Sequence, residues 1–337
     1  MKILFIGGTG LISSACSELA VRRGRELYIL NRGESKKYPV PEGAQLLVSD
    51  VHGDPASLAE LLEGQHFDTV VDWIAYTVDD IERDIRLFSG KTSQFVFISS
   101  ASAYQKPPIH YIITEETPLV NPFWEYSANK IACEERLMRE YQESGFPVTI
   151  VRPSHTYGPS QIPFCVDSWQ HPWTVIDRIK SGRKVIIPGD GTSLWVLTWN
   201  GDFALGFLGL LGRAQTIGQA FHITSDEVLT WNQIYREVGQ ALNLDLEIVH
   251  IPSDLIATYD PEATGSLIGD KANSAVFDNR KIKELVPEFT CSVPWAEGVR
   301  RAIAWHEADP ARRTIDEQAN HRWDTILAAY ERAFPGK

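Results

Sequence analysis

Cysteine is scarce in this 337-residue chain, and the four cysteines stand far apart, at Cys16, Cys133, Cys165 and Cys291. No two of them have the spacing of a zinc site or of a disulfide framework. We therefore expect reduced thiols, no metal site and a cytoplasmic location.

Long apolar runs and an excess of positive charge are also missing. The first apolar stretch stops at Gly7 after four residues, and segment 203–211 is interrupted by two glycines, so we expect neither an export signal nor a membrane span. The chain has 32 Lys and Arg against 44 Asp and Glu, a net charge of -12. Such a surface opposes nucleic acid and anionic membranes, and we expect neither as a partner.

What the first half does contain is a regular alternation of short apolar runs with amphipathic patterns. The runs predict strands at 2–6, 27–30, 45–48, 69–73, 95–98 and 148–151. The amphipathic patterns predict helices at 11–23, 57–62, 78–88 and 126–141. Strands that are apolar throughout and separated by helices indicate βαβ units. The expected fold is therefore α/β, a doubly wound parallel Rossmann sheet.

After Pro153 this alternation is lost, and proline, glycine and tryptophan become frequent. We predict a dinucleotide-binding domain over residues 1–160 and a smaller, mainly substrate-binding lobe over 161–337. The chain is expected to return to the first domain at about 195–225. Amphipathic patterns predict two C-terminal helices, at 295–307 and 315–334.

A glycine-rich loop lies directly between the first predicted strand and helix. Gly7 permits a tight turn there, and Gly10 lets the backbone approach a pyrophosphate at the helix N-terminus. Ser13 replaces the third glycine of the usual fingerprint, but it is small enough for close packing of helix on strand. The residues predicted to contact the dinucleotide here are Gly7, Thr9, Gly10, Leu11 and Ile12.

The end of the second strand indicates which dinucleotide binds. An acidic residue there would favour NAD, whereas this chain has Asn31 followed by Arg32. The asparagine does not repel a 2′-phosphate, and a guanidinium binds one well, so NADP is favoured over NAD. Asp50, which closes the third strand, is a candidate adenine contact or a simple turn residue.

Tyr126 and Lys130 are four residues apart and therefore share one face of a helix. A nearby ammonium should lower the pKa of the phenol, so that the tyrosine can exchange a proton with a substrate hydroxyl. Lys130 is also expected to donate to the nicotinamide ribose. Ser100 follows an apolar strand, at the end of the sheet where ligands bind in this architecture, and can hold the reacting oxygen.

With these motifs in this order, the chain resembles the NAD-dependent epimerase/dehydratase family, the extended short-chain dehydrogenases. The resemblance covers the first ~225 residues, including the run 152–159, and continues more loosely through 188–191. It implies that Tyr126 is the acid/base, with Lys130 and Ser100 as its partners. It also implies that the backbone from Pro153 to His155 faces the nicotinamide, and that the protein is a homodimer.

Two departures from the family pattern bear on the substrate. Dehydratases of the family carry an Asp-Glu pair just after the catalytic Ser or Thr, where this chain has Ala101 and Ser102, so dehydration is not expected. Trp195 stands where many nucleotide-sugar enzymes of the family have a phosphate-binding arginine. We predict substrate contacts from Ser102, Trp195 and His155; fixing the following turn is an equal alternative for His155.

The function expected from these features is hydride transfer at a secondary carbinol or ketone of a sugar-like substrate, by an oxidoreductase or an epimerase. Both reactions use the same residues, so the sequence leaves the choice open. Two other functions stay as alternatives: an RNA-associated protein, since Asn31-Arg32-Gly33 also resembles the chloroplast stem-loop-binding relatives of the family, and an NADP sensor without turnover.

Overall fold

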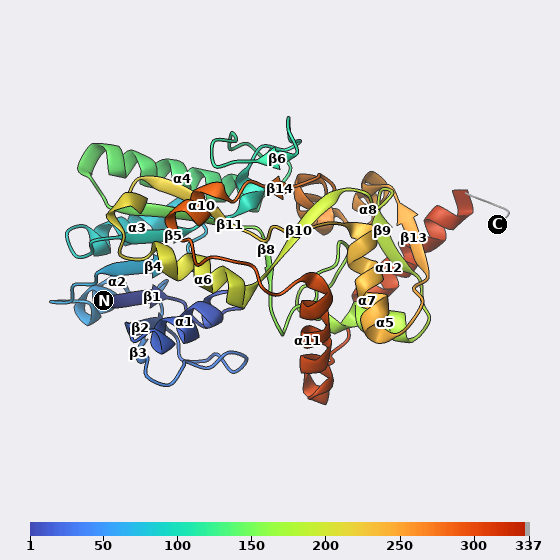
Figure 1. Cartoon of the computed structure of the whole chain (residues 1–337), viewed down its shortest axis with the longest axis horizontal. Coiled ribbons are helices and arrows are strands. Elements are labelled where there is room, and N and C mark those ends of the chain that lie inside the picture. The colour runs from blue at the N-terminus through green and yellow to red at the C-terminus, as the bar shows by residue number, and fades with distance from the viewer. Residues whose placement is uncertain (334–337) are drawn as a thin grey trace.

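The computed structural model describes residues 1–333, which are built around a seven-stranded sheet (Figure 1). All neighbouring strands are parallel. Their order across the sheet is β3 (Gln45–Val48), β2 (Glu26–Asn31), β1 (Lys2–Ile6), β4 (Thr69–Asp72), β5 (Phe95–Ile98), β7 (Val148–Pro153) and β11 (Gln219–Ile223). This confirms the predicted doubly wound fold, whose strand order reverses between β1 and β4.

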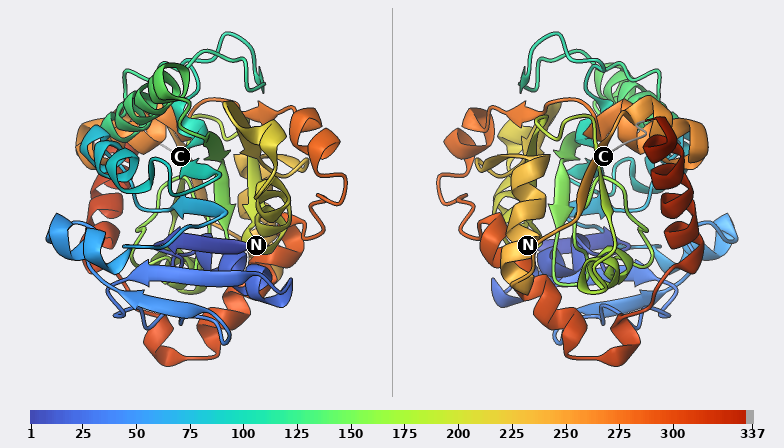
Figure 2. Two further views of the ribbon diagram at one scale, coloured as in Figure 1. Left: turned by 90° about the vertical axis from the view of Figure 1, so that its left-hand side faces the viewer. Right: turned by 90° about the vertical axis from the view of Figure 1, so that its right-hand side faces the viewer.

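Helices cover both faces of this sheet (Figure 2). One face carries α1 (Ser13–Arg22) and α6 (Asn200–Leu210); the other carries α2 (Pro55–Leu61), α3 (Val78–Phe88) and α4 (Glu125–Ser144). Side chains along β1 point alternately to the two faces of the sheet. Ile3 and Phe5 therefore pack in the first core, with α1 and α6, while Leu4 and Ile6 pack in the second core, with α2, α3 and α4.

A third core, rich in buried tryptophan, forms a lobe beside the sheet. Its three small sheets have the orders β12-β10-β8, β13-β9 and β14-β6. The strands are β6 (Ile112–Ile113), β8 (His155–Tyr157), β9 (Val185–Pro188), β10 (Leu194–Trp199), β12 (Val228–Thr230), β13 (Ile248–Ile251) and β14 (Val276–Phe277). The helices are α5 (Trp173–Lys180), α7 (Trp231–Leu242), α8 (Ser253–Tyr259), α9 (Thr264–Ser266), α11 (Trp295–Glu307) and α12 (Glu317–Ala333). The last residue of the predicted helix 315–334 lies outside the described residues.

The chain passes between the two parts more than once. It leaves the main sheet after β7, pairs β8 with β10 in the lobe, and then returns through α6 and β11. A late helix, α10 (Arg280–Leu285), packs against α6 and β11. Within residues 1–333, no helix combines the length and the apolar character needed to cross a bilayer.

Candidate active site

A cavity of about 970 Å³ lies between the carboxyl ends of the main-sheet strands and the lobe. It is lined by every site residue predicted from the sequence: Gly7, Thr9, Gly10, Leu11, Ile12, Asn31, Arg32, Asp50, Ser100, Ser102, Tyr126, Lys130, Pro153, His155 and Trp195. These residues come from widely separated segments, so the fold is what brings them together.

The glycine loop is shaped by two residues in the left-handed region, Gly7 at φ 100° and Gly8 at φ 88°. A side chain on Gly7 would be strained by this φ, and its Cβ would lie only 3.1 Å from Trp73 Cβ, a close contact. A Cβ on Gly10 would meet only Ser13 Oγ, at 3.3 Å, and Gly10 lines the cavity. The backbone is therefore open to a ligand at the glycines of the loop that leads into α1, which fits a dinucleotide pyrophosphate.

Ser13 does more than fill the place of a glycine. Its Oγ accepts a hydrogen bond from the backbone N–H of Gly10 at 2.8 Å, and the side chain is buried. The serine thus fixes the loop at the start of α1.

The outer end of the cavity is lined by Arg32 and Asp50. The Asn31 amide is used within the protein: it donates to Thr9 Oγ1 at 3.2 Å and accepts from the Gly33 N–H at 2.7 Å. Arg32 is different, because its side chain is 66% exposed and its nearest carboxylate, that of Glu34, is 3.7 Å away. The guanidinium is therefore accessible to a ligand, while Asp50 accepts from a backbone N–H within its own turn.

Lys130 is held firmly beneath the cavity wall. Its Nζ donates to the carbonyl oxygens of Ala75 at 2.7 Å and Ile98 at 2.8 Å, and the residue is only 2% exposed. The ammonium also lies 4.4 Å from the centre of the Tyr76 ring. Burial lowers the pKa of Lys130 from 10.5 to about 8.

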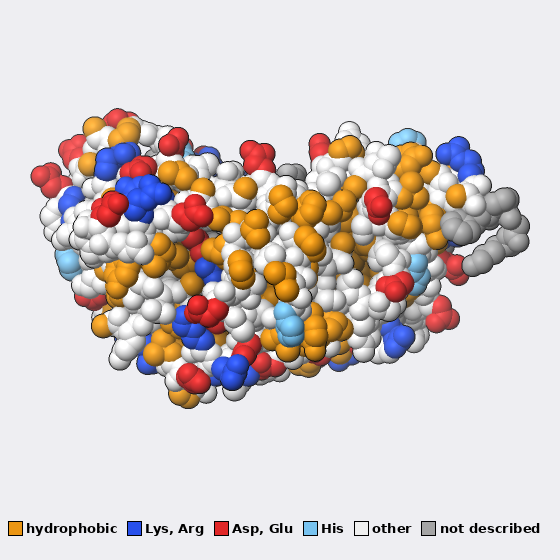
Figure 3. All heavy atoms as spheres, turned by 90° about the horizontal axis from the view of Figure 1, so that it is seen from above, with side chains coloured by type: hydrophobic (Ala, Val, Ile, Leu, Met, Phe, Trp, Pro, Cys, Tyr) orange, Lys and Arg blue, Asp and Glu red, His pale blue; other side chains and the backbone are white. Residues whose placement is uncertain are grey.

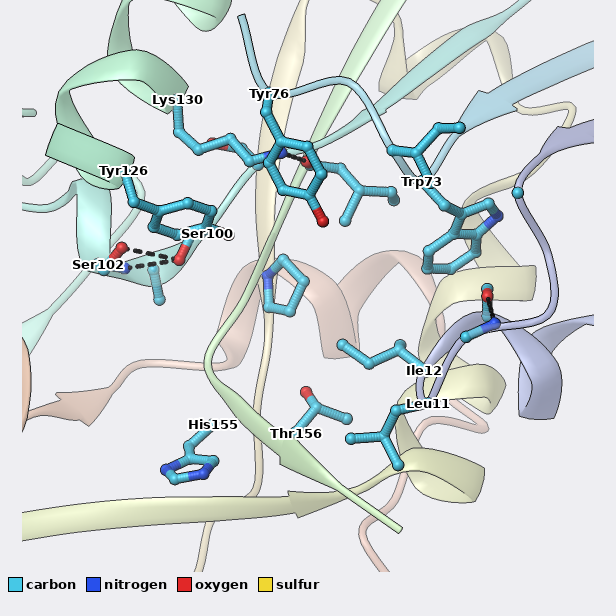
Figure 4. A pocket seen from close by; sticks show the side chains of 18 of the residues that line it. Leu11, Ile12, Trp73, Tyr76, Ser100, Ser102, Tyr126, Lys130, His155 and Thr156 are labelled. Atoms are coloured by element: carbon cyan, nitrogen blue, oxygen red, sulfur yellow. Dashed lines mark hydrogen bonds between the residues drawn. The ribbon is translucent and has the colours of Figure 1, made fainter. Parts of the chain in front are cut away.

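Tyr126 lies beside Tyr76 and Ser100 on the same side of the cavity (Figure 4). Burial, together with the neighbouring Tyr76, raises the pKa of Tyr126 to about 12, while hydrogen bonding by Ser100 acts in the opposite direction. The expectation that Lys130 lowers this pKa is therefore wrong for this structure. The physical reason is that the loss of hydration dominates and the ammonium is held by two carbonyl groups.

A chain of hydroxyl groups fixes Ser100. Its Oγ accepts from the Ser102 N–H at 3.1 Å and lies 2.9 Å from Ser102 Oγ, which in turn accepts from Ser127 at 2.7 Å. Ser102 lines the cavity but is itself buried. The three serines connect the end of β5 with the first turn of α4, the helix that carries Tyr126.

His155 lies across the cavity from Tyr126 (Figure 4). Trp195 Nε1 donates to His155 Nδ1 at 3.1 Å, and an indole N–H can only donate. His155 Nδ1 must therefore carry a lone pair, which leaves the ring proton on Nε2. Burial lowers the pKa of His155 to about 3, so the ring stays neutral near pH 7. Trp195, only 2% exposed, positions the histidine while lining the cavity.

A buried polar network supports the catalytic helix from behind. Arg152 on β7 donates to both carboxylate oxygens of Glu134 on α4, at 2.9 Å and 2.6 Å, and also to Tyr104 at 3.2 Å. Tyr104 is in turn paired with His222 on β11 at 3.0 Å. These bonds tie α4 to the sheet and so fix where Tyr126 lies.

Sequence reasoning missed several residues that line the cavity. Trp73 and Tyr76 follow β4, and the rule that singled out Ser100 after β5 could have found them too. Lys106, Asp167 and Lys271 come from segments that carried no sequence motif. Among the tryptophans that follow Pro153, Trp173 is buried without lining the cavity, whereas Trp169, 61% exposed, lines it.

The profile of the NAD dependent epimerase/dehydratase family matches residues 3–223. This chain belongs to that family. The match includes the glycine loop, Ser100, Tyr126 and Lys130.

Two relatives illustrate the range of the family. The chain is 26% identical over 261 residues to the chloroplast stem-loop binding protein of 41 kDa b from Arabidopsis thaliana. The alignment covers 74% of this chain and 65% of that protein. It is 25% identical over 336 residues to a UDP-N-acetyl-alpha-D-glucosaminuronate decarboxylase from Bacillus cytotoxicus, which covers 90% of this chain and 97% of that enzyme. The chain thus spans just under two thirds of the first relative but nearly all of the second.

Solved structures share the whole fold. An epimerase from Methanothermobacter thermautotrophicus superimposes with a TM-score of 0.73 at 17% identity, covering 97% of this chain and 94% of that one. A dTDP-glucose 4,6-dehydratase from Bacillus anthracis, solved with NAD, superimposes with a TM-score of 0.73 at 17% identity. The superposition covers 92% of this chain and 98% of that enzyme. At this level of identity the likeness shows the fold alone.

Proposed function

We propose that this protein is an NADP-dependent oxidoreductase or epimerase that transfers hydride at a secondary carbinol or ketone of a sugar-like substrate. One observation carries the proposal: Tyr126, Lys130 and Ser100 line the same cavity as the glycine loop. An acid/base and a dinucleotide can therefore act on one substrate carbon.

Each side chain then has a defined task. Tyr126 exchanges a proton with the substrate oxygen: the raised pKa keeps its phenol protonated near pH 7, ready to give the proton in reduction, and the phenolate takes it back in oxidation. Ser100, fixed by its hydroxyl chain, holds the same oxygen. Lys130 lies 5.9 Å from the centre of the Tyr126 ring and lines the cavity, where its ammonium would donate to a hydroxyl of the nicotinamide ribose. The glycine loop would hold the pyrophosphate of the dinucleotide and the backbone at Pro153 would face its nicotinamide, which when bound supplies the hydride acceptor for the carbinol carbon. If the ketone turns and the hydride returns, the outcome is epimerisation; if the ketone leaves, it is oxidation.

The residues after Ser100 favour these reactions over dehydration. Ala101 has no proton to give, and Ser102 is engaged with two other serines. The nearby Asp270 carboxylate is paired with Lys106 Nζ at 3.2 Å. Arg32 favours NADP over NAD, because its guanidinium is solvent-exposed and a 2′-phosphate could displace its 3.7 Å contact with the exposed Glu34 carboxylate.

The first experiment is to extract any cofactor from the purified protein and then titrate NAD and NADP in both redox states. Tight, exchangeable NADP is the result expected for a reductase, and retained cofactor is the result expected for an epimerase. Failure to bind either dinucleotide would contradict the proposal.

RNA association is the second candidate, because a relative is named for stem-loop binding. The net charge of -12 opposes it, and on the face in Figure 3 basic side chains are interspersed with acidic ones. Salt-dependent binding of a structured RNA by the cofactor-free protein would favour this candidate; absence of such binding would remove it.

A further inference from the structure

The lobe side of the cavity carries four ionisable side chains that the proposed reaction does not use. Two are lysines, Lys106 and Lys271, and two are carboxylates, Asp167 and Asp270. Asp270 and Lys271 lie in a π-helical turn, Leu267–Lys271. Such turns are rare and occur often at functional sites.

Only one of the two possible ion pairs is formed. Lys106 Nζ lies 3.2 Å from Asp270 Oδ1, with the lysine side chain 1% exposed. Among residues 1–333, neither the Asp167 carboxyl nor the Lys271 ammonium has a hydrogen-bond or ion-pair partner, although both line the cavity. Asp167 Oδ2 is a buried oxygen without any donor, and burial raises the pKa of the carboxyl. Leaving such a group unpaired is costly, so it calls for a donor from a ligand.

The charges on this side add up to zero. The two lysines balance the two carboxylates, and His155 contributes no charge because its Nδ1 accepts from the Trp195 indole. A diphosphate would bring two negative charges next to Asp167 and Asp270, with Lys271 as the unpaired cation available to it. Sites that bind phosphates present a surplus of cationic donors, which this side lacks.

Hydroxyl groups suit the same side chains well. A hydroxyl can donate to Asp167 and accept from Lys271 or from the Nε2–H of His155. The Trp169 indole, 61% exposed at the cavity, offers an apolar face to the C–H side of a ring.

We propose that this side of the cavity binds an uncharged polyol, a free sugar or sugar alcohol, and not a sugar carried on a nucleoside diphosphate. Asp167 and Lys271 hold its hydroxyl groups, and Trp169 covers one face. The inference rests on the proposed function, because the polyol is the compound whose carbinol reaches Tyr126.

The test uses the full chain loaded with NADP. Binding of glucose, galactose, xylose and sorbitol is measured by saturation-transfer NMR, alongside UDP and the UDP conjugates of the three sugars. We expect at least one free polyol to bind, and its Kd to rise about tenfold or more in Asp167→Ala. In Asp167→Asn, which keeps an acceptor, the Kd should rise less than in Asp167→Ala. Asp177→Ala, a lobe variant away from the cavity, should bind like the wild type.

Three results would overturn the inference: a UDP conjugate that binds more tightly than its free sugar, polyol binding unchanged in Asp167→Ala, or no polyol binding at all. Oxidation of a UDP-sugar that depends on Tyr126 would keep the proposed function and overturn only the substrate class. Failure to bind dinucleotide would contradict the proposed function itself.

Discussion

The two sides of the cavity are built in different ways. The cofactor side uses backbone and short loops at the carboxyl ends of neighbouring strands, such as the glycine loop after β1 and Arg32 after β2. The lobe side uses single side chains from distant segments, such as Lys106, Asp167 and Lys271. The difference indicates that the fold itself creates the cofactor site, whereas substrate choice depends on individual residues that can change without altering the fold.

The largest effect should come from Gly10→Val, which tests whether the cofactor side depends on bare backbone. The φ of Gly10 is not in the left-handed region, and a Cβ there meets only Ser13 Oγ, so the fold should persist. The side chain would instead enter the space proposed for the pyrophosphate, and we expect dinucleotide affinity to fall about a hundredfold or more. Calorimetric titration measures this, with the unfolding temperature as the control. Unchanged affinity would show that the dinucleotide lies elsewhere.

Lys130→Met tests how much the burial of a lysine on the cofactor side lowers the free energy of unfolding. The folded-state pKa of Lys130 is lowered to about 8, so between pH 8 and 10.5 the folded protein binds fewer protons than the unfolded chain. The free energy of unfolding of the wild type should therefore rise with pH relative to the variant, by up to about 3 kcal/mol. Denaturant unfolding at several pH values measures this difference. The exposed Lys91→Met serves as control, and a pH-independent difference for Lys130→Met would contradict the account.

Arg32→Gln asks whether cofactor choice rests on one exposed side chain. We expect the Kd for NADP to rise about tenfold, since the guanidinium is solvent-exposed, and the Kd for NAD to stay nearly constant. Arg25→Gln, an exposed change away from the cavity, should leave both values unaltered. An equal loss of affinity for NAD and for NADP would contradict the proposed contact between Arg32 and the 2′-phosphate.

Trp195→Phe should have the smallest effect, because it removes one N–H donor and keeps an aromatic ring. Without that hydrogen bond His155 can adopt either tautomer, and we expect KM to rise roughly threefold with kcat little changed. Nitrogen NMR of His155 should show the Nε2–H tautomer in the wild type and a mixture in the variant. A single unchanged tautomer would mean that Trp195 does not set it. Trp305→Phe is the matched control.

The same contrast explains how far the sequence predicts the structure. Strands 2–6 and 95–98 agree with the structure because burial on both faces of the sheet leaves clear apolar runs. Helix 78–88 agrees because its buried residues recur at helical spacing, and the exposed edge strand 45–48 agrees through its short apolar run alone. Tyr126, Lys130 and Ser100 could be found because helical spacing and strand ends are local signals. Lys271 could not be found, because its π-helical turn reaches the cavity only through the packing of the whole lobe.

One electrostatic expectation failed for a related reason. The effect of Lys130 on Tyr126 was inferred from their spacing, but pKa values depend on burial and on hydrogen-bond partners that spacing does not specify. The carbonyls of Ala75 and Ile98 hold the ammonium, and they come from other strand ends. Helices and strands can be predicted from local sequence patterns, whereas the pKa values of the site residues depend on contacts that only the folded chain creates.

The most direct test of the central claim is hydride transfer by Tyr126→Phe on the substrate identified with the wild type, with dinucleotide affinity measured on the same sample. The account predicts unchanged affinity and a loss of about a hundredfold to 10⁴-fold in kcat, because only the phenolic proton acceptor is removed. Tyr259→Phe, at the end of α8 and exposed without lining the cavity, should match the wild type. A Tyr126→Phe variant that binds the dinucleotide and retains full activity would contradict the proposed catalytic role.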